Sequence, residues 1–128
     1  MQYVSVEEYL MGRAKQEELS DELKANMNTL MPRVNDLLEK FGQYRKVNSG
    51  YRRQADNDAT ANAAKKSKHL LCAAVDLEDA DGKLKAFCMA NLPVLKELEL
   101  WMEAGASTPT WCHVQIFAPK SGNRVFLP

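Results

Sequence analysis

Apolar residues recur at three- and four-residue steps between residues 20 and 42, and this period constrains the fold more than any other feature of the chain. The spacing places one apolar stripe along a helix, so the core must lie against that stripe. Ser20 provides an N-cap and Gly42 ends the run. Pro32 removes one backbone donor inside the segment, which predicts a kink or a break into two helices. The stripe consists of Leu23, Met27, Leu30, Met31, Val34, Leu37, Leu38 and Phe41.

Shorter signals flank this helix. Ser5 and Glu8 have the spacing of a capping box, which predicts a short helix that ends near Gly12. Residues 45–53 are a strand candidate, and the polar stretch 54–68 is typical of a surface loop with one helical turn. Residues 72–77 predict a strand in which the period of two places Cys72, Ala74 and Asp76 on one face.

The last third of the chain predicts helices and then strands. Residues 82–91 and 93–103 have helical patterns, with Glu103 at the end of the second. Residues 113–118 and 124–127 predict two short strands, joined by a turn-prone segment into an antiparallel pair. The order of elements indicates an α+β domain with N-terminal helices packed on a small, mainly antiparallel sheet. We expect one domain over residues 1–128, with a helical part at 1–42.

The charges balance, with 17 Lys and Arg residues against 17 Asp and Glu residues, so no overall field attracts nucleic acid or an anionic membrane. The basic run at 65–68 lacks interleaved aromatic residues and predicts a solvated loop, not a nucleic-acid site. The first eight residues are polar and acidic, unlike a signal peptide, and no apolar run has the length of a membrane span. We therefore expect a soluble protein, made in the cytosol, with no transmembrane segment.

The only two histidines of the chain, His69 and His113, have the sequence context of a split zinc site with Asp76. Two imidazoles and a carboxylate are good zinc ligands, and they leave the fourth tetrahedral position for water, as a hydrolytic site requires. The three cysteines cannot all pair within one chain, and we interpret them as reduced, buried thiols. Cys72 and Cys112 adjoin the histidines closely enough that either is an alternative ligand in place of Asp76.

Three segments together resemble the zinc-dependent D-alanyl-D-alanine carboxypeptidases and L-alanyl-D-glutamate endopeptidases that cut bacterial cell-wall peptides. The first is Ser49-Gly-Tyr-Arg52, which resembles the "SGYR" segment of that family. The second runs from Ser67 through His69 and Ala74 to Asp76, and the third is Trp111-Cys-His113-Val-Gln115. The resemblance covers about the last two thirds of the chain.

The resemblance implies zinc as cofactor, with His69, Asp76 and His113 as its ligands in the 43–128 core. It also implies that Arg52 holds a substrate carboxylate, a role for which the planar fork of guanidinium donors is well suited. Ser67 orders the loop before His69 or contacts the substrate. We expect a monomer that acts on a peptidoglycan peptide.

Two positions depart from the family pattern. Cys72 replaces a glycine, and Thr110 stands three residues before His113, where relatives often have an acidic general base. Threonine cannot accept the proton that amide hydrolysis must transfer. Glu103 is our candidate for that base, with Glu78 and Asp79 as alternatives.

These observations predict a zinc metallopeptidase that hydrolyses peptidoglycan stem peptides or cross-links, typical of a phage or prophage lysis enzyme. Such an enzyme accumulates in the host cytoplasm and acts on the wall after release, or is carried by the virion. One alternative is a D-alanyl-D-alanine dipeptidase with the same zinc architecture. The other is a zinc-containing peptidoglycan-binding module without catalysis, which Thr110 favours.

Overall fold

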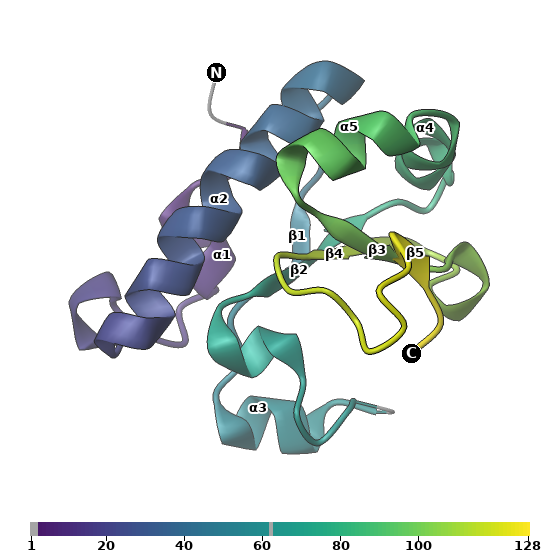
Figure 1. Ribbon diagram of the computed structural model, residues 1–128. Coiled ribbons are helices and arrows are strands. Elements are labelled where there is room, and N and C mark those ends of the chain that lie inside the picture. The colour runs from purple at the N-terminus through teal and green to yellow at the C-terminus, as the bar shows by residue number, and fades with distance from the viewer. Residues whose placement is uncertain (1–2, 62) are drawn as a thin grey trace.

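A computed structural model describes residues 3–61 and 63–128 and is shown in Figure 1. Met1 and Gln2, in the polar N-terminal segment that is unlike a signal peptide, and Asn62, in the predicted polar loop, lie outside the described residues. The helices are α1 (Val6–Leu10), α2 (Asp21–Phe41), α3 (Gln54–Ala59), α4 (Lys83–Ala90) and α5 (Leu92–Leu98). Three short 3₁₀ helices are η1 (Gln16–Glu18), η2 (Lys68–Leu71) and η3 (Gly105–Ser107). None of the described helices is long and apolar enough to cross a membrane.

The two N-terminal helices begin where the capping residues predict. The Ser5 hydroxyl accepts a hydrogen bond from the Glu8 amide at 3.0 Å, and the Ser20 hydroxyl accepts one from the Leu23 amide at 3.2 Å. Gly42 ends α2 in the left-handed conformation, with φ of 91°. In Figure 1, α2 and α5 lie beside each other, while α3 lies at the opposite end of the molecule from α4 and α5.

Of the predicted kink or break at Pro32, the break into two helices is wrong, because α2 runs without interruption from Asp21 to Phe41. Proline removes one backbone donor and disfavours the helix locally. Met31 and Val34, on either side of it, are buried in the core, as are Met27 and Leu30 one turn earlier. Burial of the stripe offsets the lost hydrogen bond, since tertiary packing supplies most of the stability of helices in proteins.

The small sheet confirms the α+β class. Its strand order is β1-β2-β4-β3-β5, and three of the four pairings are antiparallel. The predicted pairing of the last two strands with each other is wrong, because β5 pairs in parallel with β3 and β4 lies between β2 and β3. The strands are β1 (Val47–Ser49), β2 (Ala74–Glu78), β3 (Trp101–Glu103), β4 (Trp111–Gln115) and β5 (Val125–Phe126).

The end of the second C-terminal helix is also predicted wrongly. That helix, α5, ends at Leu98, Glu99 takes a left-handed conformation, and Trp101–Glu103 form β3. Leu98 and Met102 fit a helical step of four, whereas Leu100 and Met102 fit the step of two of a strand. The periodicity alone does not distinguish the two, and Glu103 therefore lies on a strand, not on a helix.

The alternation along the strands gives the sheet two chemically different faces. One face joins the hydrophobic core, which extends from Val4 to Ile116 and includes α2, α4 and α5. Its residues are Val75, Leu77, Met102, Cys112 and Val114. The residues between them on β2, β3 and β4 belong to the opposite face, because successive side chains of a strand point to opposite sides. That opposite face holds Asp76, Glu103, His113 and Gln115.

Candidate metal centre

The structure brings together the three residues that the sequence predicts as metal ligands. One nitrogen of His69, one nitrogen of His113 and one oxygen of Asp76 all lie within 4.8 Å of one another, and all three residues are buried. Asp76 on β2 is the direct cross-strand partner of His113 on β4. His69 reaches the same point from η2, which leads into β2. Sheet register and the preceding turn together assemble the group.

The His69 ring is oriented by a backbone carbonyl. Its Nδ1 lies 2.8 Å from the carbonyl oxygen of Gly50, and a carbonyl only accepts, so Nδ1 bears the proton of the neutral ring. The lone pair is then on Nε2, which lies 3.3 Å from Oδ2 of Asp76. Burial lowers the pKa of His69, which keeps the ring neutral and available as a ligand.

His113 faces the other oxygen of the same carboxylate. Its Nδ1 lies 2.8 Å from Oδ1 of Asp76, and its ring centre is 5.4 Å from that of His69. Burial disfavours the charged ring, but the hydrogen bond and the negative charge of Asp76 outweigh it and raise the pKa of His113. Burial also opposes ionisation of Asp76, yet contacts with the two imidazoles hold the pKa of that carboxyl well below its usual range. The electrostatics therefore favour a cation at the point where the three groups meet.

This donor set fits zinc. Tetrahedral zinc with ligand distances of about 2.1 Å places its ligand atoms roughly 3.4 Å apart. The imidazole nitrogens lie 2.8 Å from Oδ1 and 3.3 Å from Oδ2 of Asp76, and one donor atom of each residue lies within 4.8 Å of the other two. Neutral imidazole and carboxylate suit zinc chemically, and three protein ligands are typical of a catalytic site. His69, Asp76 and His113 could thus hold the ion.

Arg52 lies against the same carboxylate. Its Nη2 is 3.5 Å from Oδ2 of Asp76, its Nε donates to the Ser49 hydroxyl at 2.9 Å, and its Nη1 donates to Oδ1 of Asn57 at 3.3 Å. A guanidinium has five N–H groups, so one hydrogen on each terminal nitrogen is left after these three contacts. Arg52 is largely buried, and burial lowers its pKa. It can position Asp76 and still offer two donors to a ligand.

Ser67 and Cys72 both act on the turn that holds His69. The Ser67 hydroxyl accepts a hydrogen bond from the His69 amide at 3.2 Å, so this serine orders the loop. Cys72 ends η2 in the left-handed conformation, with φ of 56°, and its side chain is buried in the core. The prediction that Cys72 shares a face with Asp76 is therefore wrong, because the left-handed residue interrupts the alternation before β2 begins at Ala74.

The alternative thiol ligands do not reach the site. Among the described residues, the group of potential ligands around Asp76 contains no cysteine. Cys112 precedes His113 on β4 and so points into the core on the other side of the sheet. The interpretation of the cysteines as buried free thiols is confirmed.

The structure brings Glu103 to the site, from β3. Its Oε2 lies 3.9 Å from Nδ1 of His113, and burial raises its pKa, as expected for a group suited to accept a proton. The alternatives are engaged elsewhere. Glu78 pairs with Arg45 at 3.5 Å, and both oxygens of Asp79 accept backbone amides at the start of α4. Thr110 is exposed in the loop before β4.

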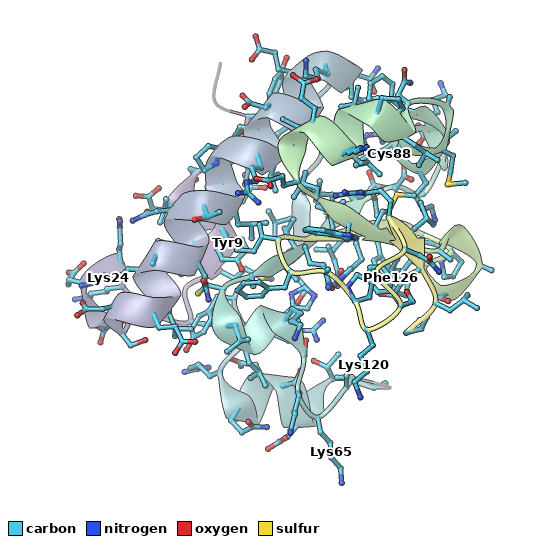
Figure 2. All side chains as sticks on the ribbon, viewed as in Figure 1. Tyr9, Lys24, Lys65, Cys88, Lys120 and Phe126 are labelled. Atoms are coloured by element: carbon cyan, nitrogen blue, oxygen red, sulfur yellow. The ribbon has the colours of Figure 1, made fainter. Side chains whose placement is uncertain are left out.

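Sequence reasoning missed three groups around the site. These are the carbonyl of Gly50, the side chain of Asn57, which bridges Arg52 and the carbonyl of Ala64, and the side chain of Gln115. Only Gln115 gives a sequence signal, since it follows His113 by two residues and so shares its face of β4. The basic run at 65–68 contributes no ligand; Lys65 and Lys66 are exposed, and Figure 2 shows Lys65 pointing outward at the α3 end.

Gly50 lets its own backbone lie close to the backbone of Tyr9, and the carbonyl of Gly50 in this position orients the His69 ring. A Cβ at this position would lie 2.0 Å from the carbonyl oxygen of Tyr9 in α1, and that oxygen accepts the Tyr51 amide at 3.1 Å. We expect Gly50→Ala to lower the free energy of unfolding by roughly 3 kcal/mol, because a backbone atom must move. Urea denaturation measures this change.

The matched control for that prediction is Gly105→Ala. The nearest atom to a Cβ at Gly105 is the Cδ of Lys85, at an ordinary contact distance of 3.8 Å. Its stability should change by less than about 0.5 kcal/mol, as for most surface substitutions. Equal stability of the two variants would show that the Gly50 contact is not tight in solution.

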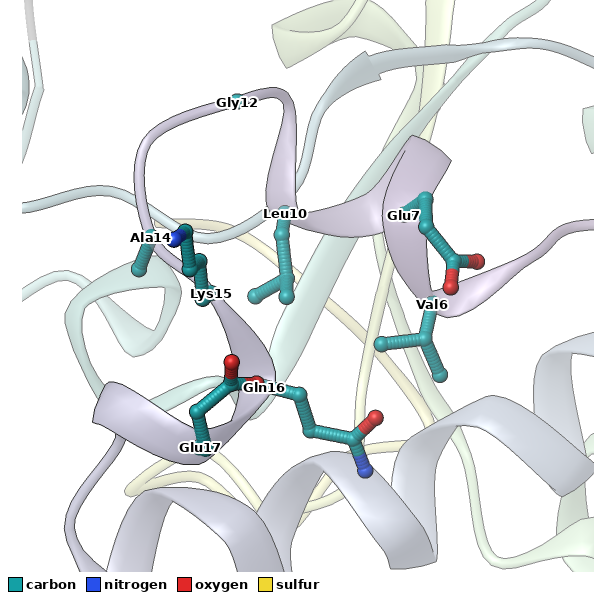
Figure 3. Close-up of a pocket in the computed structure, with 8 residues that line it drawn as sticks. All are labelled: Val6, Glu7, Leu10, Gly12, Ala14, Lys15, Gln16 and Glu17. Carbon is teal, nitrogen blue, oxygen red and sulfur yellow. The ribbon is translucent and has the colours of Figure 1, made fainter.

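A separate hollow lies on the N-terminal part of the molecule. It has a volume of about 330 Å³ and is lined by residues of α1, η1 and the segment between them, as Figure 3 shows. Its lining includes Val6, Leu10, Ala14 and Gln16 and none of the residues of the metal centre. The chemistry of the site therefore does not extend into this hollow.

Comparison with known families identifies the family of this chain. The family model named peptidase M15 matches residues 2–96, which are 95 of the 128 residues. The chain therefore belongs to the peptidase M15 family, the zinc-dependent metallopeptidases of the D-alanyl-D-alanine carboxypeptidase and endopeptidase type. The matched region includes His69 and Asp76 and ends before Glu103 and His113. No curated protein and no solved structure matches the chain.

Proposed function

We propose that this metallopeptidase hydrolyses peptide bonds in the stem peptides or cross-links of bacterial peptidoglycan, with zinc held by His69, Asp76 and His113. One observation supports this most directly. A half-buried carboxylate, Glu103, lies beside three buried zinc-type ligands, two of which, Asp76 and His113, share its face of the sheet. Ligands and a proton acceptor in that arrangement are what hydrolysis of an amide requires.

Each residue has a distinct role in this proposal. When bound, zinc supplies Lewis-acid chemistry toward a carbonyl group and a water molecule. Glu103 takes the proton from the attacking water and passes it to the leaving amine. Arg52 directs its two remaining N–H donors at a substrate carboxylate, and its contact with Asp76 keeps it at the site.

Two observations support a cell-wall peptide as the substrate, namely the family of the chain and the chemistry of Arg52. Stem peptides are rich in carboxylates, which suit a planar guanidinium fork. We extend the proposal to a role in phage or prophage lysis, because an enzyme that opens cross-links weakens the sacculus. Such an enzyme would act as a monomer, either after release from the host cytoplasm or as part of a virion.

Purified sacculi incubated with the zinc-loaded protein test the proposal. We expect new amino groups on stem peptides, identified by mass spectrometry of the released and the retained fragments. Turnover of free D-alanyl-D-alanine without any change in sacculi would instead support a dipeptidase. Zinc-loaded protein that binds sacculi without cutting would support a binding module, the alternative favoured by Thr110 at the position where relatives often have an acidic residue. Either result contradicts wall hydrolysis.

A further inference from the structure

Gln115 forms a continuous hydrogen-bonded chain from the metal centre to the backbone. Its Oε1 lies 2.8 Å from Nε2 of His113, and its Nε2 donates to the carbonyl oxygen of Phe117 at 2.7 Å. Gln115 is only 4% exposed, so water does not compete for these contacts. On the other side of the His113 ring, Nδ1 faces Asp76.

This hydrogen-bonded chain determines which nitrogen of the His113 ring bears a proton. The Phe117 carbonyl can only accept a hydrogen bond, so the NH₂ end of the Gln115 amide must face it. The oxygen end of the amide therefore faces His113, and this oxygen also only accepts. Nε2 of His113 must then bear a hydrogen. The proton that Nδ1 shares with Asp76 is therefore the one that the neutral ring lacks, and the lone pair available to a metal ion is on Nδ1.

We infer that Gln115 is a positioning residue that fixes His113 as an Nδ1 ligand and thereby sets the zinc affinity of the site. The inference rests on the proposed function, because it assigns a donor atom toward the zinc ion. His69 is fixed in the same way by the carbonyl of Gly50, but that acceptor belongs to the backbone and no substitution removes it. At His113 the acceptor is a side chain, so this half of the arrangement can be tested directly.

The test compares Gln115→Met with Gln115→Glu. Methionine approximates the length of glutamine without its hydrogen-bonding groups, whereas glutamate keeps an oxygen that accepts from Nε2 of His113. Loss of such an outer partner lowers metal affinity about 10–100-fold. We expect that loss in Gln115→Met and a smaller one in Gln115→Glu, which keeps the acceptor for Nε2 of His113 but loses the donor to the Phe117 carbonyl. Competition with a chromophoric chelator measures zinc affinity without reference to catalysis.

A control and a second measurement make the test independent of folding. Gln16→Met, at an exposed position in η1, should leave zinc affinity unchanged. In the zinc-loaded wild-type protein, nitrogen-15 NMR should show a proton on Nε2 of His113 and on Nδ1 of His69. The opposite tautomer at His113 overturns the inference even if Gln115→Met does not fold.

The outcomes separate the inference from the proposed function. Wild-type protein that takes up no stoichiometric zinc contradicts the proposed function. Wild-type protein that binds zinc, together with a folded Gln115→Met that binds it equally well, contradicts only the role of Gln115. Equal losses in Gln115→Met and Gln115→Glu also contradict it, because glutamate retains the acceptor.

Discussion

Replacing His113 with alanine is expected to lower zinc affinity by about two orders of magnitude. Zinc sites with four protein ligands bind with roughly 10–16 kcal/mol, so each ligand contributes on the order of 3 kcal/mol. Metal analysis after dialysis against a weak chelator measures the change, and His69→Ala should behave in the same way.

Cys112→Ala is the matched control for this prediction. It alters the neighbouring residue of β4, whose side chain points into the core and not toward Asp76. The protein should become less stable, since a buried side chain is shortened, but it should keep its zinc. Stoichiometric zinc in His113→Ala, or its loss in Cys112→Ala, would contradict the ligand assignment and favour the thiol.

Replacing Glu103 with glutamine is expected to reduce the rate of peptide hydrolysis by about 10²–10⁴-fold. Glutamine keeps the size of the side chain but cannot accept the proton, while His69, Asp76 and His113 are unchanged. Zinc content should stay stoichiometric, which distinguishes loss of the base from loss of the metal. The rate of fragment release from sacculi and the zinc content of the same sample give both quantities.

Glu78→Gln tests the alternative base. Glu78 pairs with Arg45 in a partly exposed ion pair, and loss of such a pair has little effect on stability. We expect nearly normal hydrolysis. A normal rate in Glu103→Gln, or a large loss in Glu78→Gln, would move the catalytic role away from Glu103.

The ligand triad could be predicted from the sequence because each of its residues lies in a short, distinctive segment. His69 and Asp76 are separated only by a turn and the start of a strand, so their proximity depends on local structure. His113 requires a nonlocal pairing, that of β2 with β4. His113 was found because the chain has only two histidines and because its segment carries the resemblance, and not from the hydrophobic pattern.

Other features could not be predicted, because they depend on contacts between distant segments. The step from Leu98 to Met102 fits a helix as well as the step from Leu100 to Met102 fits a strand, so the pattern placed Glu103 on the wrong element. The uninterrupted helix through Pro32 depends on packing against the core. The orientation of the Gln115 amide depends on one backbone carbonyl, at Phe117, which no sequence pattern specifies.

The alternation of β4 has a consequence for how such a protein can diversify. His113 stands between Cys112 and Val114, which pack in the core. Insertion or deletion of a single residue within Trp111–Gln115 would move core-facing side chains to the site face and site-facing side chains into the core. The imidazole would then be buried among apolar groups. Length changes are therefore tolerated only outside the strand, in the connecting segments 104–110 and 118–124. Homologues with different substrate preferences should differ in the lengths of those segments while the spacing within β4 stays constant.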